Sequence, residues 1–199
     1  MTASARVLYV CTANRCRSPF AEHTLRRALA VAGIDTVTVA SAGLLPGGAP
    51  VPRAGLVVAR ERGLPLAGHL SRPLADLEFP LETVDLVLVM ERAHARELVA
   101  DHGAPFARVF TLKQFDRWSA THAFGGTRLG EWLDDAAEDR SPAALLGTSA
   151  TDDTADPIDR PAPAWRTMAD AFEQHARAVA QWLAPLRGHD ASSSSTPAS

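Results

Sequence analysis

The stretch Val10–Glu22, V-C-T-A-N-R-C-R-S-P-F-A-E, places a cysteine, an arginine and a serine close together. A strand that ends at Val10, a tight loop and a helix that begins near Ser18 would surround one concave site with backbone N–H groups, which suit an oxyanion. The planar guanidinium of Arg17 could bind two phosphate oxygens at once. These donors should favour the thiolate of Cys11, which makes that residue a nucleophile aimed at a bound phosphate.

Arg17 would stand in the first turn of the helix, where a cation opposes the helix dipole unless an anion binds. Such a conflict between a residue and its position is typical of a functional site. Phosphoryl transfer has a loose transition state, so positioning and charge neutralisation carry most of the catalysis. Ser18 has two open roles, because its hydroxyl could donate to the Cys11 sulfur or cap the helix.

The string C-T-A-N-R-C-R-S-P fits Cys-x5-Arg-Ser, the phosphate-binding loop of phosphatases that work through a cysteinyl-phosphate. Its Asn14, Cys16 and Pro19, and its place near the N-terminus, resemble the low-molecular-weight protein tyrosine phosphatases of bacterial type. The resemblance implies that Cys11 is the nucleophile and that Arg17 binds the phosphate. It also implies that the phosphate-binding loop consists of Thr12, Ala13, Asn14, Arg15, Cys16 and Ser18.

The resemblance continues downstream of the loop, over most of residues 5–112 and 152–186. Its further motifs are S-A-G at 41–43, G-L-P-L-A-G-H-L-S-R at 63–72, D-L-V-L-V-M-E at 85–91 and A-D-P-I at 155–158. We expect the S-A-G motif to follow the second strand. The resemblance implies that Ser41 and His69 support the strained loop. The neighbourhood of His69 carries one extra residue, which leaves a plain surface histidine as the alternative.

The A-D-P-I motif implies that Asp156 is the general acid, which protonates the leaving oxygen and then activates water. Pro157 would restrict Asp156 to an extended conformation and stiffen the loop. The loop is rich in carboxylates, and Asp159 is the rival for this role.

Three positions depart from the family pattern. The family usually has tyrosines after the Asp-Pro, and this chain has Ile158 and Asp159. Arg15 stands where an apolar residue is common; facing outward it would favour a substrate with nearby acidic groups. These residues belong to the rim of the pocket, so the sequence predicts phosphate-monoester hydrolysis and leaves the preference for aryl phosphates open. Cys16 could form a reversible disulfide that protects Cys11, or it is a buried thiol.

Hydrophobic runs that alternate with helical patterns predict an α/β fold, a parallel sheet with helices on both faces. The predicted strands are 6–10, 36–40, 84–90 and 108–111, and the predicted helices are 18–31, 51–62, 91–102 and 164–186. The resemblance implies four strands in the order 2-1-3-4. Residues 1–188 should form one domain, in which 113–151 is an atypical excursion with one or two short helices. The Ser-rich tail 189–199 should be disordered.

The net charge of −3 gives no bias toward nucleic acid or anionic membranes. No apolar run is long enough to span a bilayer or serve as a signal peptide, so we expect a cytoplasmic protein. Cys11 and Cys16 are the two cysteines of the chain, too few for a disulfide framework or a structural zinc site. We expect no metal and no cofactor, and a monomer or weak dimer that acts on a phosphotyrosine protein or another phosphate monoester.

Two other functions fit the same loop. An arsenate reductase would bind arsenate in place of phosphate, but the thioredoxin-coupled type needs further cysteines after Cys16, which leaves a version that uses a small-molecule thiol. A phosphate- or phosphopeptide-binding module without turnover is the second alternative. Such a module should have lost Cys11, Arg17 or Asp156, and all three are present.

Overall fold

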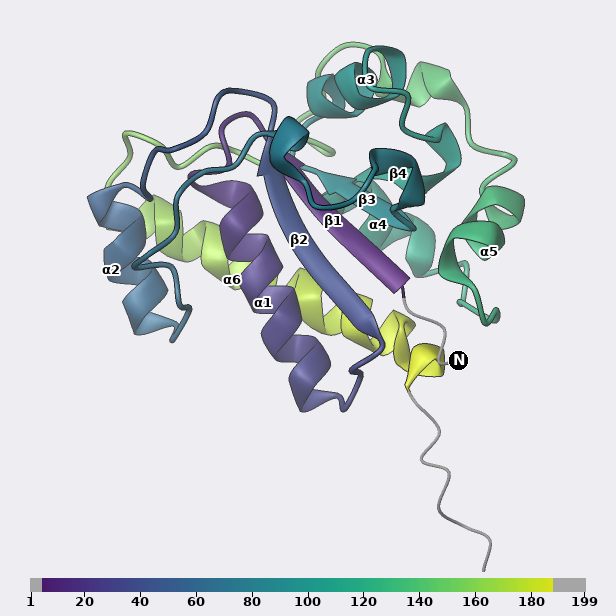
Figure 1. Cartoon of the computed structure of the whole chain (residues 1–199), viewed down its shortest axis with the longest axis horizontal. Helices are drawn as coiled ribbons and strands as arrows, with labels where there is room; N and C mark the ends of the chain where they lie inside the picture. Colours follow the sequence, from purple (N-terminus) through teal and green to yellow (C-terminus); the bar gives the residue numbers. More distant parts are fainter. Residues whose placement is uncertain (1–4, 188–199) are drawn as a thin grey trace, which may run out of the picture.

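The computed structural model describes residues 5–187 as three layers, in which a parallel sheet lies between helices (Figure 1). The strands are β1 (Ala5–Cys11), β2 (Val37–Gly43), β3 (Leu86–Val89) and β4 (Val109–Thr111). They pair in parallel in the order β2-β1-β3-β4, which confirms the predicted α/β fold. The predicted disordered tail, 189–199, lies outside the described residues.

Six α-helices and five short 3-10 helices accompany these strands within the described residues, and five of these eleven helices follow β4. The α-helices are α1 (Arg17–Val31), α2 (Arg53–Glu61), α3 (Arg92–Ala100), α4 (Leu112–Ser119), α5 (Leu129–Ala136) and α6 (Ala162–Trp182). The 3-10 helices are η1 (Leu74–Asp76), η2 (Leu81–Thr83), η3 (Phe106–Arg108), η4 (Pro142–Leu145) and η5 (Ala184–Leu186).

The central strands are buried on both faces, because their side chains alternate between two apolar clusters. Tyr9 of β1 and Leu88 of β3 belong to the larger cluster, with α1, α2, α6 and the helices of the excursion. Leu8 and Val87 belong to the smaller cluster on the opposite face, which α3 covers. This arrangement leaves the carboxyl end of β1, next to the start of α1, as the place where the Cys11 loop forms.

Two element boundaries differ from the prediction for identifiable reasons. β2 runs three residues past its predicted end, since it pairs with β1 as far as Cys11 and Gly43. The S-A-G motif therefore forms the end of this strand and does not follow it. Helix α2 begins at Arg53 and not at Val51. Val51 directly precedes Pro52, and the residue before a proline disfavours helical backbone angles.

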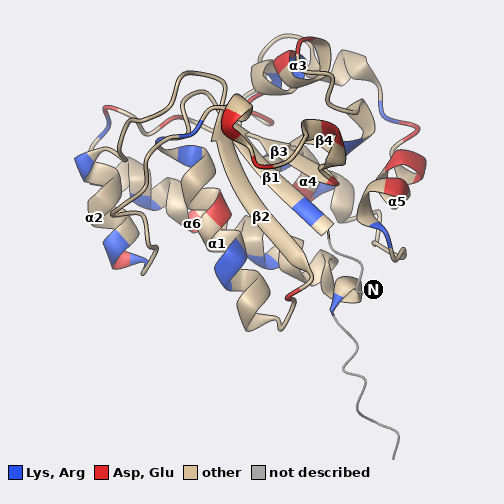
Figure 2. Cartoon of the chain, in the orientation of Figure 1, with Lys and Arg blue, Asp and Glu red and all other residues tan. Residues whose placement is uncertain are grey.

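The excursion, 113–151, packs against the same core as the rest of the chain. It comprises most of α4, then α5 and η4, so two α-helices confirm the expected number. Trp118 and Trp132 lie with their ring centroids 6.3 and 5.5 Å from that of Trp182 in α6. Aromatic contacts therefore join the excursion to the C-terminal helix. Helix α5 contains several acidic residues (Figure 2), of which Glu131 and Asp135 are exposed.

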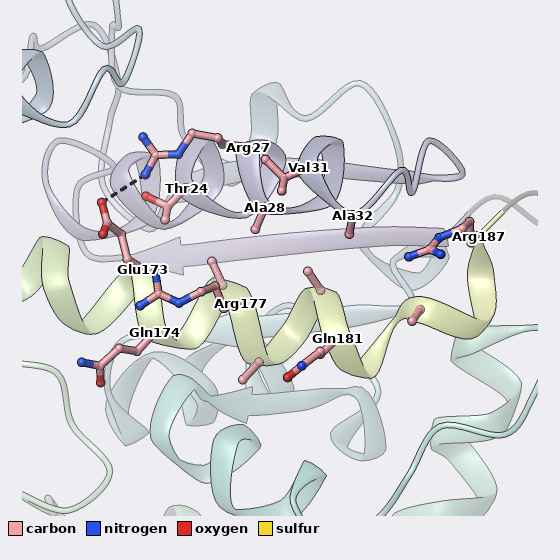
Figure 3. A pocket seen from close by; sticks show the side chains of 14 residues that line it. Thr24, Arg27, Ala28, Val31, Ala32, Glu173, Gln174, Arg177, Gln181 and Arg187 are labelled. Atoms are coloured by element: carbon pink, nitrogen blue, oxygen red, sulfur yellow. Dashed lines mark hydrogen bonds and ion pairs between the residues drawn. The ribbon is translucent and has the colours of Figure 1, made fainter.

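Helices α1 and α6 lie against each other along much of their lengths (Figure 1). Between them runs an open groove lined by alanines together with longer polar and charged side chains, where Arg27 of α1 reaches Glu173 of α6 at 3.1 Å (Figure 3). No residue of the Cys11 loop lines this groove, so it is separate from the candidate site.

Candidate active site

Cys11 lies at the end of the central strand β1, and Arg17 begins α1 only a short loop later. The Cys11 Sγ lies 3.1 Å from the Ser18 Oγ and accepts a hydrogen bond from the Asn14 backbone N–H at 3.2 Å. The Asn14 N–H therefore donates to the sulfur, and the Ser18 hydroxyl, which also reaches the Ala42 carbonyl at 3.3 Å, lies within hydrogen-bond distance of it. The geometry brings the predicted nucleophile and Ser18 together as the sequence led us to expect.

Asn14 holds the loop in its shape. Its φ of 50° lies in the left-handed region, which asparagine tolerates better than most residues. Its Nδ2 donates to the Ser18 Oγ at 2.9 Å and to the Ser41 Oγ at 2.8 Å. Its Oδ1 accepts from the Arg72 backbone N–H at 3.0 Å, and its carbonyl accepts from the His69 Nε2 at 2.8 Å. Ser41 and His69 thus both contact this single loop residue.

Gly43 allows strand β2 to approach the loop closely. A Cβ at this position would lie 2.8 Å from the Ala13 carbonyl carbon and 2.9 Å from the Asn14 nitrogen. Backbone atoms cannot move away from such a close contact, whereas the end of a flexible side chain could. The glycine of the S-A-G motif is therefore required by the loop that packs on it.

Arg17 is buried, with a side chain only 2% exposed, and two carboxylates bind its guanidinium. Its Nη1 pairs with Glu91, just after β3, and donates to the Thr154 carbonyl at 3.1 Å. Its Nη2 lies 2.6 Å from the Asp156 Oδ2, and its Nε has no partner among residues 5–187. Arg17 therefore joins the phosphate loop to the segment that carries the predicted general acid.

Asp156, and not its rival Asp159, contacts the candidate site. Its Oδ2 binds Arg17, and its Oδ1 accepts the Ile158 backbone N–H at 2.9 Å, which fixes the carboxylate orientation. Asp159 is exposed, has a left-handed φ of 60°, and its carboxylate has no hydrogen bond or ion pair within the described part of the chain. Ile158 is half-buried against the larger apolar cluster.

Thr12 contacts a buried histidine that the sequence analysis did not single out. The Thr12 Oγ1 lies 2.9 Å from the His94 Nε2 and accepts a long hydrogen bond, 3.4 Å, from Arg17. Burial lowers the pKa of His94 to about 4; nearby Arg17 adds to this effect, and Glu91 opposes it. His94 is therefore neutral at pH 7.

The two remaining loop side chains face different surroundings. Arg15 is half-buried, and its Nε donates to the Pro50 carbonyl at 3.0 Å, which places this arginine against the segment before α2. Cys16 is buried, and this burial, with the charge of Asp156, raises its pKa to about 12. Both cysteines are free thiols, so the regulatory disulfide stays a prediction.

Comparison with known proteins agrees with the family resemblance that these motifs indicate. The family described as low molecular weight phosphotyrosine protein phosphatase matches residues 6–125. The chain belongs to this family. The relatives named protein-tyrosine phosphatases are phosphoric monoester hydrolases. The predicted boundary of the resemblance at residue 112 was too early, because the match includes α4.

Similar proteins include phosphatases for two different phosphorylated residues. The protein-arginine-phosphatase of Bacillus subtilis is 36% identical over 111 residues, which cover 55% of this chain and 71% of that protein. The low molecular weight protein-tyrosine phosphatase A of Mycobacterium tuberculosis is 36% identical over 127 residues, 62% of this chain and 74% of the relative.

Solved structures agree with this assignment. The low molecular weight protein tyrosine phosphatase from T. tengcongensis has a TM-score of 0.64 and 26% identity, covering 89% of this chain and 99% of its own. A cysteine-to-serine variant of the YwlE arginine phosphatase, described with a phosphorylated active-site serine, has a TM-score of 0.66 and 25% identity over 89% of this chain and 95% of its own. In that relative the phosphoryl group thus resides on the side chain at the position of the replaced cysteine.

Sequence reasoning missed several residues of this phosphatase that contact its candidate site. They are Glu22, Arg72, Glu91, His94 and Thr154. One signal could have found Glu91: it comes just after β3, and the carboxyl ends of parallel strands meet at one edge of the sheet. Glu22 lies one helical turn after Ser18 and accepts from the Ser41 hydroxyl, a contact that depends on β2 and has no sequence signature.

The predicted general acid, Asp156, lies outside the region that the family match covers, which ends at residue 125. The assignment of Asp156 therefore depends on its contact with Arg17 and on the orientation of its carboxylate. Among residues 5–187, no group of three or more His, Cys, Asp or Glu side chains is arranged to hold a metal ion.

Proposed function

We propose that this phosphatase hydrolyses phosphate monoesters on protein side chains through a phosphorylated Cys11, with Asp156 as general acid. Phosphotyrosine is the leading substrate. The observation that carries the proposal is the 2.6 Å contact between Asp156 and Arg17, beside the Cys11 sulfur, which accepts the Asn14 N–H and lies 3.1 Å from the Ser18 Oγ. This contact supports the roles of acid, phosphate-binding cation and nucleophile for three residues at one end of the sheet.

In the first step the Cys11 thiolate attacks phosphorus, and the bond from phosphorus to the leaving oxygen breaks. A protonated Asp156 gives its proton to that oxygen, so a neutral alcohol or phenol departs. In the second step the Asp156 carboxylate takes a proton from water, the water oxygen bonds to phosphorus, and the sulfur–phosphorus bond breaks. The Ser18 hydroxyl, 3.1 Å from the sulfur, stabilises the thiolate that leaves.

Arg17 has to exchange partners when a phosphate binds. Its two Nη atoms contact Glu91 and Asp156, whereas a phosphate over the loop would require donors from the same guanidinium. A phosphate that takes the Arg17 guanidinium therefore frees the Asp156 Oδ2, so that this carboxyl can face the leaving oxygen of the substrate. Substrate binding thus prepares the acid for the first step.

The decisive experiment is hydrolysis of a small aryl phosphate across pH, in EDTA, by wild type, Cys11→Ser and Asp156→Ala. We expect no turnover for Cys11→Ser and a loss of roughly 100-fold or more for Asp156→Ala. An inert wild type that still binds phosphate would favour the binding-module reading. An inert wild type that reduces arsenate with a small-molecule thiol would favour the reductase reading.

Phosphoarginine is a second candidate substrate. The contact of Asp156 with the Arg17 guanidinium demonstrates that this carboxylate can bind such a group, and Ile158 stands where the family usually has a tyrosine. The similarity to a protein-arginine-phosphatase adds support. The comparison to make is kcat/KM for one peptide that carries either phosphotyrosine or phosphoarginine at the same position. A higher value for phosphoarginine would replace the leading assignment.

The cellular setting is part of the same proposal. We place the enzyme in the cytoplasm as one domain, residues 1–188, that acts as a monomer or weak dimer without nucleic acid or membrane partners. Free Cys11 and Cys16 support a reducing compartment. None of the helices within residues 5–187 is both long and apolar enough to cross a membrane. Cell fractionation and sedimentation of the purified chain test these assignments.

A further inference from the structure

The segment before Asp156 contains a buried carboxylate for which the mechanism has no use. Asp152 is 2% exposed, and both of its oxygens have donors. Its Oδ1 binds the Arg117 guanidinium, and its Oδ2 accepts from the Arg92 Nε at 2.6 Å and from the Gln114 Nε2 at 2.9 Å. Arg92 begins α3, whereas Gln114 and Arg117 belong to α4. Asp152 therefore joins two helices to the segment that leads to Asp156.

The backbone around Asp152 is held by the same two helices. The Arg117 Nη1 donates to the Thr151 carbonyl at 3.0 Å, and the Lys113 Nζ donates to the Asp153 carbonyl at 2.6 Å. The Asp153 Oδ1 accepts the Arg92 backbone N–H at 2.8 Å. The chain thus has no freedom to shift here without the loss of several hydrogen bonds at once.

These contacts continue directly to the reacting groups. The Thr154 N–H donates to the Met90 carbonyl at 2.7 Å, just after β3, and the Thr154 carbonyl accepts from Arg17 at 3.1 Å. Asp156 follows two residues later and contacts the same guanidinium. A shift of the segment at Asp152 would therefore move both the general acid and a partner of the phosphate-binding arginine.

The charge of Asp152 is needed for this arrangement. Burial by itself raises the pKa of the carboxyl, but hydrogen bonds from Arg117, Arg92 and Gln114 outweigh burial and leave the pKa below its usual range. The group is therefore ionised at neutral pH. A neutral residue in its place would leave two guanidinium groups without their shared partner.

We propose that Asp152 is a positioning residue, which fixes the general-acid segment over the phosphate loop by joining it to α3 and α4. This inference rests on the proposed role of Asp156. It also gives a function to part of the excursion, since α4 supplies Lys113, Gln114 and Arg117 as the fixed support for that segment.

The test is the dependence of kcat/KM on the leaving group, measured for Asp152→Asn. An acid matters most for a poor leaving group, so we expect at least a ~10-fold loss with phenyl phosphate and less than about 3-fold with 2,4-dinitrophenyl phosphate. Asp156→Ala should show the same pattern more strongly. In Asp156→Ala, addition of Asp152→Asn should cause no further loss, because both changes disable one function.

Asp134→Asn is the matched control. Asp134 also binds an arginine through two hydrogen bonds, from the Arg108 Nε at 2.9 Å and from its Nη2 at 2.5 Å, but it lies in α5, away from the acid segment. We expect no change with either substrate. Arg117→Gln is a second variant, which keeps the test decisive if Asp152→Asn does not fold. The Arg117 side chain is 56% exposed, and its replacement leaves the donors to the Asp152 Oδ2 in place. It should reproduce the leaving-group pattern at smaller amplitude.

The outcomes separate this inference from the proposed function. If kcat/KM falls equally for both substrates in Asp152→Asn and Arg117→Gln, or does not fall, the positioning role is overturned. Activity of the wild type would still support the proposed phosphatase function. If the wild type is inert, hydrogen exchange still decides whether Asp152 fixes the segment. Amide exchange over 150–158 should accelerate in Asp152→Asn and stay unchanged in Asp134→Asn; equal exchange in both variants would refute the anchoring.

Discussion

At the scale of single residues, Asp156 and a bound phosphate compete for one guanidinium. Arg17 is buried and its Nη2 contacts the Asp156 Oδ2 at 2.6 Å, so an anion over the loop must displace this carboxylate. In the proposed mechanism the side chain that donates the proton thus also occupies the proposed phosphate-binding group, Arg17, before substrate binds.

Asp156→Ala should therefore bind inorganic phosphate more tightly than wild type, by roughly 5- to 10-fold, even as turnover falls. The reason is that the variant loses both the competitor for Arg17 and a negative charge beside the anion. Calorimetric titration with phosphate measures the effect, and Asp159→Ala, which removes an exposed carboxylate nearby, is the control. Equal or weaker binding by Asp156→Ala would contradict the competition.

The two thiols of the loop should differ sharply in reactivity. Burial and the charge of Asp156 raise the pKa of Cys16 to about 12, so this residue stays a thiol at neutral pH. The Cys11 sulfur, by contrast, accepts the Asn14 backbone N–H, lies 3.1 Å from the Ser18 Oγ and is the proposed nucleophile. Iodoacetate at pH 7 should alkylate Cys11 at least ~10-fold faster than Cys16, as read by mass spectrometry of the digested protein. Phosphate should protect Cys11 from the reagent. Preferential modification of Cys16 would show that the donors do not act on Cys11.

At the scale of elements, the phosphate loop depends on how closely strand β2 can approach it. Gly43→Ala would place a Cβ 2.8 Å from backbone atoms of the loop, so either the strand or the loop must move. We expect a loss of about 1–3 kcal/mol in the free energy of unfolding and a lower kcat. Gly125→Ala, where a Cβ would meet nothing within 4 Å, should change neither quantity in urea unfolding or assays. Full stability and activity of Gly43→Ala would contradict this close packing.

Local patterns predicted the elements better than they predicted the ends of the elements. Continuous apolar runs in β1 and β3 and the helical spacing in α6 are local properties, and they indicated the correct elements. The extension of β2 to Gly43 required its pairing with Cys11, a contact between distant parts of the chain. No local pattern contains that information.

The same limit applies to the site. The motif around Cys11 revealed the loop, because its residues are consecutive. Glu91 and Asp152 escaped detection because their roles come from Arg17 and from α4, which folding brings to them. A buried carboxylate is indistinguishable from an exposed one in a sequence until its partners are known.

At the scale of the whole molecule, the candidate site exists only when both ends of the domain are in place. Arg17, near the start of the chain, contacts Thr154 and Asp156, near its end. Helix α6, which follows Asp156 along the chain, packs against α1, the helix that begins with Arg17. This packing holds the two segments in contact. Global stability and the position of Asp156, the proposed general acid, are therefore coupled.

His94 makes that stability depend on pH. Its pKa is lowered to about 4 in the native state, mainly by burial, whereas an unfolded histidine titrates near 6.5. Between these values the unfolded chain binds more protons than the native protein, so the stability that neutral His94 permits is fully present above about pH 6.5 and is lost as pH falls toward about 4. Protonation of His94 lowers the free energy of unfolding by at most about 3 kcal/mol.

His94→Gln should remove this part of the acid sensitivity, because glutamine cannot bind the proton and its amide can still reach Thr12. Urea unfolding at pH 7.5 and pH 4.5 measures the free energies of both proteins. We expect the advantage of wild type over His94→Gln to shrink, or to reverse, at the lower pH, since carboxylates common to both proteins cancel in the difference. A difference that stays constant between the two pH values would mean that His94 takes up its proton as readily in the native protein as in the unfolded chain.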